Sequence, residues 1–243
     1  MKKIIEVKNL TKRFNDLLVI DNISFDIFEG EIICIVGTSG CGKSTLLNIL
    51  SQLDNNYDGI VKTSISKNDI GYMMQEPALF PWLDIKSNAE LACKIKKINN
   101  NGYVDNLLKK YSLYEFKNNY PNTLSGGMKQ RLSLIRTLST KPKVLFLDEP
   151  FAALDYQTRL AICDDVYKAI KENNITAILV THDISEAISI ADRVIVLSKR
   201  PTKIKNTYEI NLTNKSSPLL NYQDEKFPYY HQNIGRDLDI FET

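Results

Sequence analysis

The stretch GTSGCGKST at 37–45 has the glycine and lysine spacing of a phosphate-binding loop. It ends the apolar run EIICIVG and precedes leucines at helical spacing, so a buried strand, a loop and a helix come in the required order. The backbone N–H groups of such a loop converge on phosphate oxygens, and the helix N-terminus adds positive potential. The Lys43 ammonium would reach the β- and γ-phosphates, and the Ser44 hydroxyl would bind Mg²⁺. The predicted nucleoside triphosphate site comprises Gly37, Thr38, Ser39, Gly40, Cys41, Gly42, Lys43, Ser44 and Thr45.

The run VLFLDEP at 144–150 places an acidic pair at the end of a second buried strand. Open α/β sheets bind their ligands at the carboxyl ends of the strands. Asp148 would hold Mg²⁺, usually through water, and Glu149 would polarise the attacking water. A strand that ends in a solvated Asp-Glu-Pro turn is the alternative, but beside a phosphate loop the pair predicts hydrolysis of the bound triphosphate.

A second glycine element, LSGGMKQR at 124–131, opens another helical pattern. Ser125, Gly126 and Gly127 would present backbone N–H groups to an anion, and glycine lets the backbone approach a phosphate closely. Taken alone, this stretch would more often be an ordinary capped helix. Two phosphate-binding elements in one chain of this size therefore need an explanation.

The order of these motifs resembles that of the ATP-binding subunits of ABC transporters, over nearly all of residues 1–200. The resemblance includes Gln75 in GYMMQEP, ALD at 153–155 and His182 in VTHD. In that family, the signature of one subunit meets the ATP on the phosphate loop of another, in a head-to-tail dimer. The resemblance thus implies ATP and Mg²⁺ as cofactors, a second copy of the chain as partner, and an active ATPase.

The resemblance also implies roles for single residues. Gln75 resembles the glutamine that contacts Mg²⁺ and water and couples the site to the membrane partner, and His182 resembles the switch histidine at the γ-phosphate. Asp155 resembles the aspartate of a dimer contact. Phe14 resembles the aromatic that stacks on adenine, with a core phenylalanine as the alternative. Met128 stands where the family more often has glutamine, and the Ser-Gly-Gly contact remains.

Hydrophobic periodicity indicates which elements position these residues. The first quarter alternates apolar and polar residues in IIEVKNL and NISFDIF, as strands do. Later, apolar runs such as KVLFLDEP and ITAILVTHD alternate with helical patterns. This alternation predicts an α/β fold with a mainly parallel core sheet. The family resemblance adds the ABC cassette of the P-loop NTPases, with an N-terminal antiparallel β subdomain. The expected parts are an ATP-binding domain at 1–200, its inserted helical subdomain at about 76–140, and a short C-terminal extension at 201–243.

Within the expected helical subdomain, one amphipathic helix follows the loop after Gln75. Ser87 with Glu90 makes a plausible capping box. Leu91, Ile95 and Ile98 then fall on one face. That face is expected to be the buried one.

The composition narrows the class of protein. The net charge of +2 and the lack of a basic stripe argue against nucleic acid as a partner. No run approaches the roughly 18 apolar residues that span a bilayer. The four cysteines are scattered without a CxxC pair, so neither a zinc site nor a disulfide framework is indicated and a reducing cytoplasm is expected.

Cys41 lies beside a helix N-terminus, where a thiol is expected to have a lowered pKa. It is therefore expected to react readily with maleimide unless Mg-ATP protects it.

The wording LFPWLDIKSNAEL, GGMKQRLSLIRTL and VLSKRP resembles the nitrate/sulfonate/taurine group of importers. That resemblance implies transmembrane permease subunits, an extracellular or periplasmic substrate-binding protein, and a peripheral location at the cytoplasmic face of the membrane. Leu79, Phe80 and Trp82 would border the groove that receives a permease helix, with packing inside the helical subdomain as the alternative. Substrate choice would belong to the partners.

Three other classes of protein share part of this pattern. Soluble ABC ATPases that act on DNA ends or ribosomes carry the same motifs, but with long coiled-coil insertions or two cassettes in one chain. A nucleotide-binding module with little turnover would not need Glu149 and His182. A phosphate-loop kinase leaves LSGGMKQR unexplained. Transport is therefore the favoured function.

Overall fold

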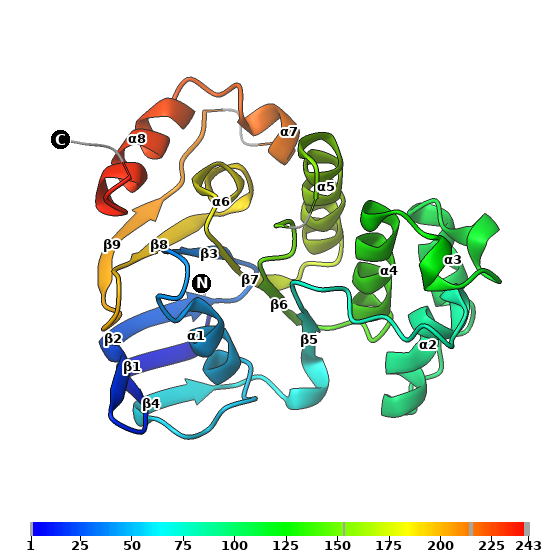
Figure 1. Cartoon of the computed structure of the whole chain (residues 1–243), viewed down its shortest axis with the longest axis horizontal. Coiled ribbons are helices and arrows are strands. Elements are labelled where there is room, and N and C mark those ends of the chain that lie inside the picture. The colour runs from blue at the N-terminus through cyan, green and yellow to red at the C-terminus, as the bar shows by residue number, and fades with distance from the viewer. Residues whose placement is uncertain (1, 153, 214–215, 241–243) are drawn as a thin grey trace.

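Two β-sheets organise the computed structural model, which describes residues 2–152, 154–213 and 216–240 (Figure 1). The larger sheet has the strand order β5-β6-β7-β3-β8-β9 and is parallel except for the antiparallel pair β8 and β9. Its strands are β3 (Ile32–Val36), β5 (Ile70–Met73), β6 (Val144–Asp148), β7 (Thr176–Thr181), β8 (Arg193–Leu197) and β9 (Ile204–Glu209). The smaller sheet is antiparallel and contains β1 (Lys3–Phe14), β2 (Leu17–Phe28) and β4 (Asp58–Thr63). The predicted α/β class, with a mainly parallel core sheet and a separate antiparallel sheet, is confirmed.

Helices cover both faces of the larger sheet, which explains why its central strands are apolar throughout. Ile32, Cys34 and Val36 of β3 face one core, and Ile33 and Ile35 face the other. Figure 1 shows α1 and the smaller sheet on one side and α5, α6 and α8 on the other. The helices are α1 (Lys43–Leu50), α2 (Ile85–Lys96), α3 (Tyr103–Lys110), α4 (Gly126–Leu138), α5 (Tyr156–Glu172), α6 (Ile184–Ile190), α7 (Pro218–Asn221) and α8 (Phe227–Asp237). Short 3₁₀ turns are η1 (Lys67–Asp69), η2 (Tyr114–Phe116) and η3 (Pro121–Thr123).

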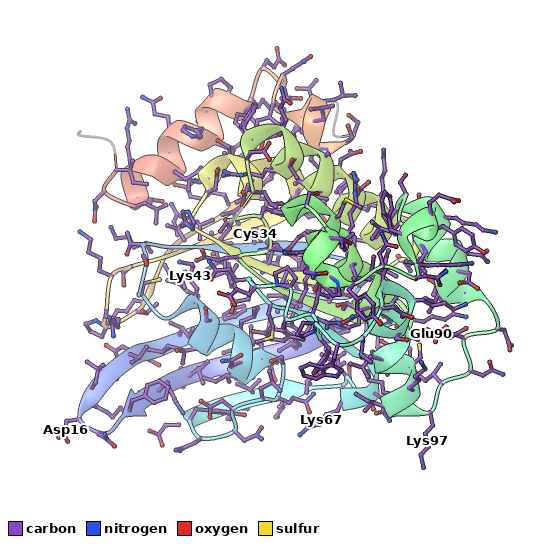
Figure 2. The ribbon with its side chains drawn as sticks, turned by 45° about the vertical axis from the view of Figure 1, so that its right-hand side comes forward. Asp16, Cys34, Lys43, Lys67, Glu90 and Lys97 are labelled. Atoms are coloured by element: carbon purple, nitrogen blue, oxygen red, sulfur yellow. The ribbon has the colours of Figure 1, made fainter. Side chains whose placement is uncertain are left out.

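Helices α2, α3 and α4 pack against one another beside β5 and β6 (Figure 1). Figure 2 places Glu90 and Lys97, at the middle and the end of α2, on the far side of the molecule from Lys43. The expected division into an ATP-binding domain, a helical subdomain and an extension stays a prediction. No helix among the described residues is long and apolar enough to cross a membrane.

The predicted start and buried face of α2 are wrong. Asp84 is the N-cap residue, and its side chain accepts a hydrogen bond from the Ser87 backbone N–H at 2.6 Å. The buried face carries Ile85, Ala89 and Cys93, whereas Ile95 is 72% exposed. The helix carries two stripes of apolar residues, and the buried stripe is the one with the smaller side chains, which allow close packing on α4.

The last part of the chain is built into the core. The segment TKIKNTYEINL contains β9, which extends the larger sheet. Helices α7 and α8 cover α6, and Phe227 and Ile234 of α8 are buried. The side chain of Asn221 is fully buried and donates to the Ser189 carbonyl of α6 at 2.7 Å. The C-terminal end of α6 is thereby held by α7, and α8 packs on the same helix.

Candidate nucleotide-binding site

The phosphate loop joins β3 to α1, as its strand-loop-helix pattern predicts. Gly40 and Gly42 have φ angles of 73° and 116°, a region that side-chain-bearing residues rarely adopt. A Cβ on Gly37 would lie 2.7 Å from Cys41 Sγ. These glycines therefore let the loop fold tightly in front of the α1 N-terminus.

Lys43, the first residue of α1, turns its ammonium back toward the carbonyl oxygens of the loop. Its Nζ donates to the carbonyl oxygens of Gly37 at 3.0 Å and Thr38 at 3.3 Å. Its third partner is Glu149 Oε1 at 3.3 Å. The side chain is almost fully buried, so its charge is held at the centre of the loop, beside the end of β6.

Oxygen atoms for a metal ion lie next to this ammonium. Ser44 Oγ donates to Asp148 Oδ1 at 3.0 Å, and Tyr72 OH lies 3.4 Å from Asp148 Oδ2. Burial and the neighbouring Glu149 raise the pKa of Asp148, and the Ser44 hydrogen bond opposes them. A hydroxyl and a carboxylate suit Mg²⁺, which keeps several waters and binds few protein ligands. The described residues contain no cluster of three acidic, histidine or cysteine side chains for a metal. Ser44 and Asp148 thus fit Mg²⁺ held together with phosphate and water.

Tyr72 is a site residue that the sequence did not reveal. It lies on β5 directly opposite Phe146 of β6, and its ring stacks on Phe146. Its hydroxyl also donates to Asn48 Oδ1 of α1 at 3.1 Å. Burial, followed by the charge of Asp148, raises the pKa of Tyr72. The phenol stays neutral and buttresses the Asp148 carboxylate.

Glu149 and His182 meet because β6 and β7 are neighbours in the sheet. His182 Nδ1 lies 2.9 Å from Glu149 Oε2. Glu149 has a φ of 43°, and its backbone N–H donates to the Val180 carbonyl at 3.0 Å. A positive φ is uncommon for a non-glycine residue and is a form of strain found at functional sites. The Glu149 carboxylate is held between the imidazole and the Lys43 ammonium.

Gln75 follows β5 at the same edge of the sheet, since Met73 pairs with Leu147 just before Asp148. Its side chain is exposed. The loop beyond it is anchored by Arg136 of α4, whose guanidinium donates to the carbonyls of Pro77 at 2.7 Å and Ala78 at 2.8 Å. Arg136 is a second contact that no sequence pattern indicated.

The signature stretch begins α4. Ser125 is the N-cap residue, and its hydroxyl accepts from the Met128 N–H at 3.3 Å. Ser125 and Gly126 are exposed, but a Cβ on Gly127 would lie 2.5 Å from Thr158 Cγ2 of α5. Gly127 is therefore required by helix packing in addition to any phosphate contact. Figure 1 shows α4 well apart from α1, so the two glycine elements of one chain do not form one site.

The motif series matches a known family. A family model described as ABC transporter matches residues 20–152, more than half of the chain. The chain belongs to the ABC transporter family. YtlC of Bacillus subtilis strain 168, an uncharacterized ABC transporter ATP-binding protein, is 38% identical and covers 91% of this chain and 88% of its own length. SsuB of Bacillus thuringiensis, an aliphatic sulfonates import ATP-binding protein, is 38% identical and covers 86% of this chain and 87% of its own.

Solved structures show the same ABC fold. One is a dimeric ATP-binding cassette in a post-hydrolysis state with ADP and Pi bound, with a TM-score of 0.72 at 31% identity. It covers 85% of this chain and 99% of its own. This ABC chain is therefore an ATPase that binds ATP and serves a transporter.

Two further residues of the ABC cassette were assigned by resemblance. Phe14 lies at the end of β1, is 49% exposed, and has Lys12 Nζ at 4.7 Å from its ring centroid, so the core alternative is wrong. Its stacking on adenine stays a prediction. Asp155 caps α5 and accepts from the Thr158 N–H at 3.0 Å, a hydrogen bond that lowers the pKa of Asp155. Its dimer contact also stays a prediction.

The expected low pKa of the Cys41 thiol is wrong. The side chain is 2% exposed, and burial raises its pKa, outweighing the opposing charge of Lys43. All four cysteines are buried. Because the thiolate is the reactive form, the native ABC ATPase is expected to react slowly with a thiol reagent at neutral pH.

Absorbance of the released thiol product, followed in native buffer and in denaturant, checks this expectation. The unfolded chain serves as the control and should release four equivalents rapidly. One native thiol that reacts at the rate of free cysteine, with or without Mg-ATP, would contradict the buried position of Cys41.

Proposed function

We propose that this chain is the ATP-hydrolysing subunit of an ABC importer and acts at the cytoplasmic face of the membrane as a peripheral subunit. The placement of Glu149 between Lys43 and His182 carries the proposal of hydrolysis. The separation of α4 from α1 supports a head-to-tail dimer in which Ser125 of one copy meets the ATP of the other (Figure 1). Each dimer then binds two ATP molecules between its two copies.

In the proposed reaction, Glu149 accepts a proton from the attacking water as general base. The His182 imidazole orients that carboxylate and contacts the γ-phosphate, and the Lys43 ammonium leaves the loop carbonyls to bind the β- and γ-phosphates. Ser44, Asp148 and Gln75 would hold Mg²⁺, which would neutralise charge on the phosphate oxygens. The water oxygen bonds to the γ-phosphorus as the bond from that phosphorus to the bridging oxygen breaks, which yields ADP and phosphate, and charge repulsion then reopens the dimer.

The nitrate/sulfonate/taurine type of importer is supported by the relatives named as aliphatic sulfonates import proteins. Such a system adds transmembrane permease subunits and an extracellular or periplasmic substrate-binding protein. The transported substrate is chosen by those partners. The chain itself supplies the ATP-driven closure of the dimer.

A groove beside the Gln75 loop suits a helix of the permease. Its cavity is about 400 Å³, and its lining includes Tyr72, Phe80, Leu91, Ala92 and Ile95. Apolar patches on a surface mark interaction sites. At the rim, the Phe80 and Trp82 rings meet edge to face with centroids 5.3 Å apart. Trp82 is 70% exposed, so packing inside the helical bundle does not account for it.

Co-purification tests the transport function. The chain is tagged in its native cell, the membranes are solubilised in mild detergent, and the companions are identified. An integral membrane protein in equal amount is expected. Recovery in the soluble fraction with nucleic acid or ribosomes would overturn the transport function and favour a soluble ABC ATPase.

The groove makes a more specific prediction. Ala92→Glu places a carboxylate in the groove and is expected to lower the co-purified permease at least about tenfold, or about 1.4 kcal/mol. Leu220→Glu is the control, because Leu220 of α7 is 55% exposed and its replacement adds the same negative charge away from the groove. It should leave the amount of co-purified permease unchanged. ATP binding of both variants is measured to show an intact fold. Undiminished recovery with Ala92→Glu would move the docking site elsewhere.

A further inference from the structure

One arginine side chain of α5 contacts two loops of the site. Arg159 Nη2 donates to the Leu154 carbonyl at 3.2 Å, and Nη1 donates to Asp183 Oδ2 at 3.1 Å. Arg159 Nε lies 3.7 Å from Glu186 Oε1 of α6. The side chain is 28% exposed, so these contacts are partly shielded from solvent. One guanidinium thereby joins the loop at 154–155 to the stretch at 183–186 that begins α6.

The contacted residues are direct neighbours of predicted site residues. Leu154 precedes Asp155, the predicted dimer contact, and Asp183 follows His182. The Arg159 side chain therefore connects the loop at 154–155 to the loop at 181–183.

The loop that carries His182 is pinned on both sides of it. The Asp183 N–H donates to Thr181 Oγ1 at 3.0 Å, and Thr181 Oγ1 donates to Glu186 Oε2 at 2.7 Å. Asp183 Oδ1 accepts from the backbone N–H groups of Ser185 at 2.8 Å and Glu186 at 3.1 Å. The backbone on either side of His182 thus follows Asp183, which Arg159 holds.

Helix α6 gives this loop a firm base. Ile184, Ala187, Ile188 and Ile190 are buried, and Asn221 of α7 donates to the Ser189 carbonyl. Because α6 is fixed in the core, a movement at Leu154 would reach the loop of His182 through the contact between Arg159 and Asp183. That loop carries the contact between His182 Nδ1 and Glu149 Oε2 at 2.9 Å.

We propose that Arg159 is a positioning residue that links the loop at 154–155 to the loop at 181–183, so that contact with a second copy at Asp155 sets the position of His182 against Glu149. The link rests on the proposed function, because it presumes dimer closure. Hydrolysis then responds to closure of the dimer as well as to occupancy by ATP.

Arginine suits this role better than lysine. The planar guanidinium has donors in a fixed fork and reaches a carbonyl and a carboxylate at once. Arg159→Lys keeps the charge near Asp183 but cannot hold both contacts in the same geometry. Arg159→Met keeps an apolar stem and removes every donor.

Turnover and dimer closure are measured separately. Arg159→Met is expected to lower kcat about tenfold or more, with KM for ATP within about twofold, and Arg159→Lys is expected to lie between it and the wild type. In protein that also carries Glu149→Gln, Arg159→Met should still form the dimer in ATP. Lys171→Met is the matched control, since it removes an ion pair of α5, with Asp192 at 3.4 Å, at the end away from both loops. It should leave kcat unchanged.

The two histidines of the chain give a direct readout. In ¹³C-histidine NMR spectra, Arg159→Met should move or broaden the ring signal of His182 in nucleotide-free protein. The ring signal of His231, which stacks on Phe227 in α8, should stay in place. This readout tests the positioning even if the wild-type chain hydrolyses no ATP, a result that would count against the proposed function instead.

Two results would overturn the proposal. The first is a kcat of Arg159→Met within twofold of the wild type. The second is a kcat that falls together with dimerisation and the thermal midpoint while the His182 signal stays unmoved, since that combination indicates a structural role alone.

Discussion

Replacing Glu149 with glutamine is expected to lower ATP turnover at least about 100-fold, because the amide cannot accept the proton of the attacking water. The amide has nearly the same shape and can keep a hydrogen bond to His182, now 2.9 Å from Oε2. ATP binding should therefore survive. The change also removes a negative charge 3.3 Å from Lys43 Nζ and beside Asp148, which favours the bound phosphates. A closed, ATP-filled dimer should accumulate.

Phosphate release measures the turnover, and sedimentation in the presence of ATP measures the dimer. Glu29→Gln is the matched control, because Glu29 is exposed and pairs only loosely with Lys2 at 3.6 Å, at the opposite end of the sheet. It should behave as the wild type. Normal turnover by Glu149→Gln, or a monomer in ATP, would remove Glu149 from the role of general base in a closed dimer.

Adding Ser125→Glu to the Glu149→Gln protein is expected to weaken the ATP-driven dimer at least about 100-fold, because a carboxylate would face the phosphates of the partner's ATP and like charges in contact cost several kcal/mol. Ser125 is exposed at the start of α4, so the larger side chain has room in the single chain. ATP binding by the monomer should remain, since α4 lies apart from the chain's own phosphate loop (Figure 1).

Sedimentation across a range of protein concentrations gives the dimer constant, and nucleotide titration gives the binding to the monomer. Ser64→Glu is the matched control, because Ser64 is exposed and lies near the start of β6, away from the carboxyl edge. Loss of monomer binding with Ser125→Glu would indicate that the signature serves its own loop. An unchanged dimer constant would place the contact outside the signature.

The main sheet could be predicted because its central strands have a simple pattern in the sequence. β3 and β7 are buried on both faces, so their runs are apolar without interruption. The glycine loop was equally readable, since Gly40 and Gly42 occupy backbone conformations that other residues rarely adopt. These features depend on local conformation and on burial of whole elements.

Features that depend on a particular neighbour could not be predicted. The buried face of α2 was missed because the sequence does not tell which of two stripes meets α4. The pKa of the Cys41 thiol was predicted in the wrong direction because the side chain is buried against Gly37. Burial raises this pKa more than the positive potential of the helix N-terminus lowers it. Tyr72 and Asp148 are 76 positions apart, and only the pairing of β5 with β6 brings them together.

The stretch that holds the nucleotide motifs is packed against the residues that follow it. β9 continues the central sheet, α8 buries Phe227 and Ile234, and the Thr202 hydroxyl donates to the carbonyl of Cys41 in the phosphate loop. A chain cut at residue 200 would retain the motifs and lose this cover, exposing the apolar surface of α6 at roughly 1.5–3 kcal/mol per large side chain. The nucleotide motifs and the structural cover therefore have different boundaries in this protein: the motifs end before residue 200, whereas described residues beyond it pack on α6 and contact the phosphate loop.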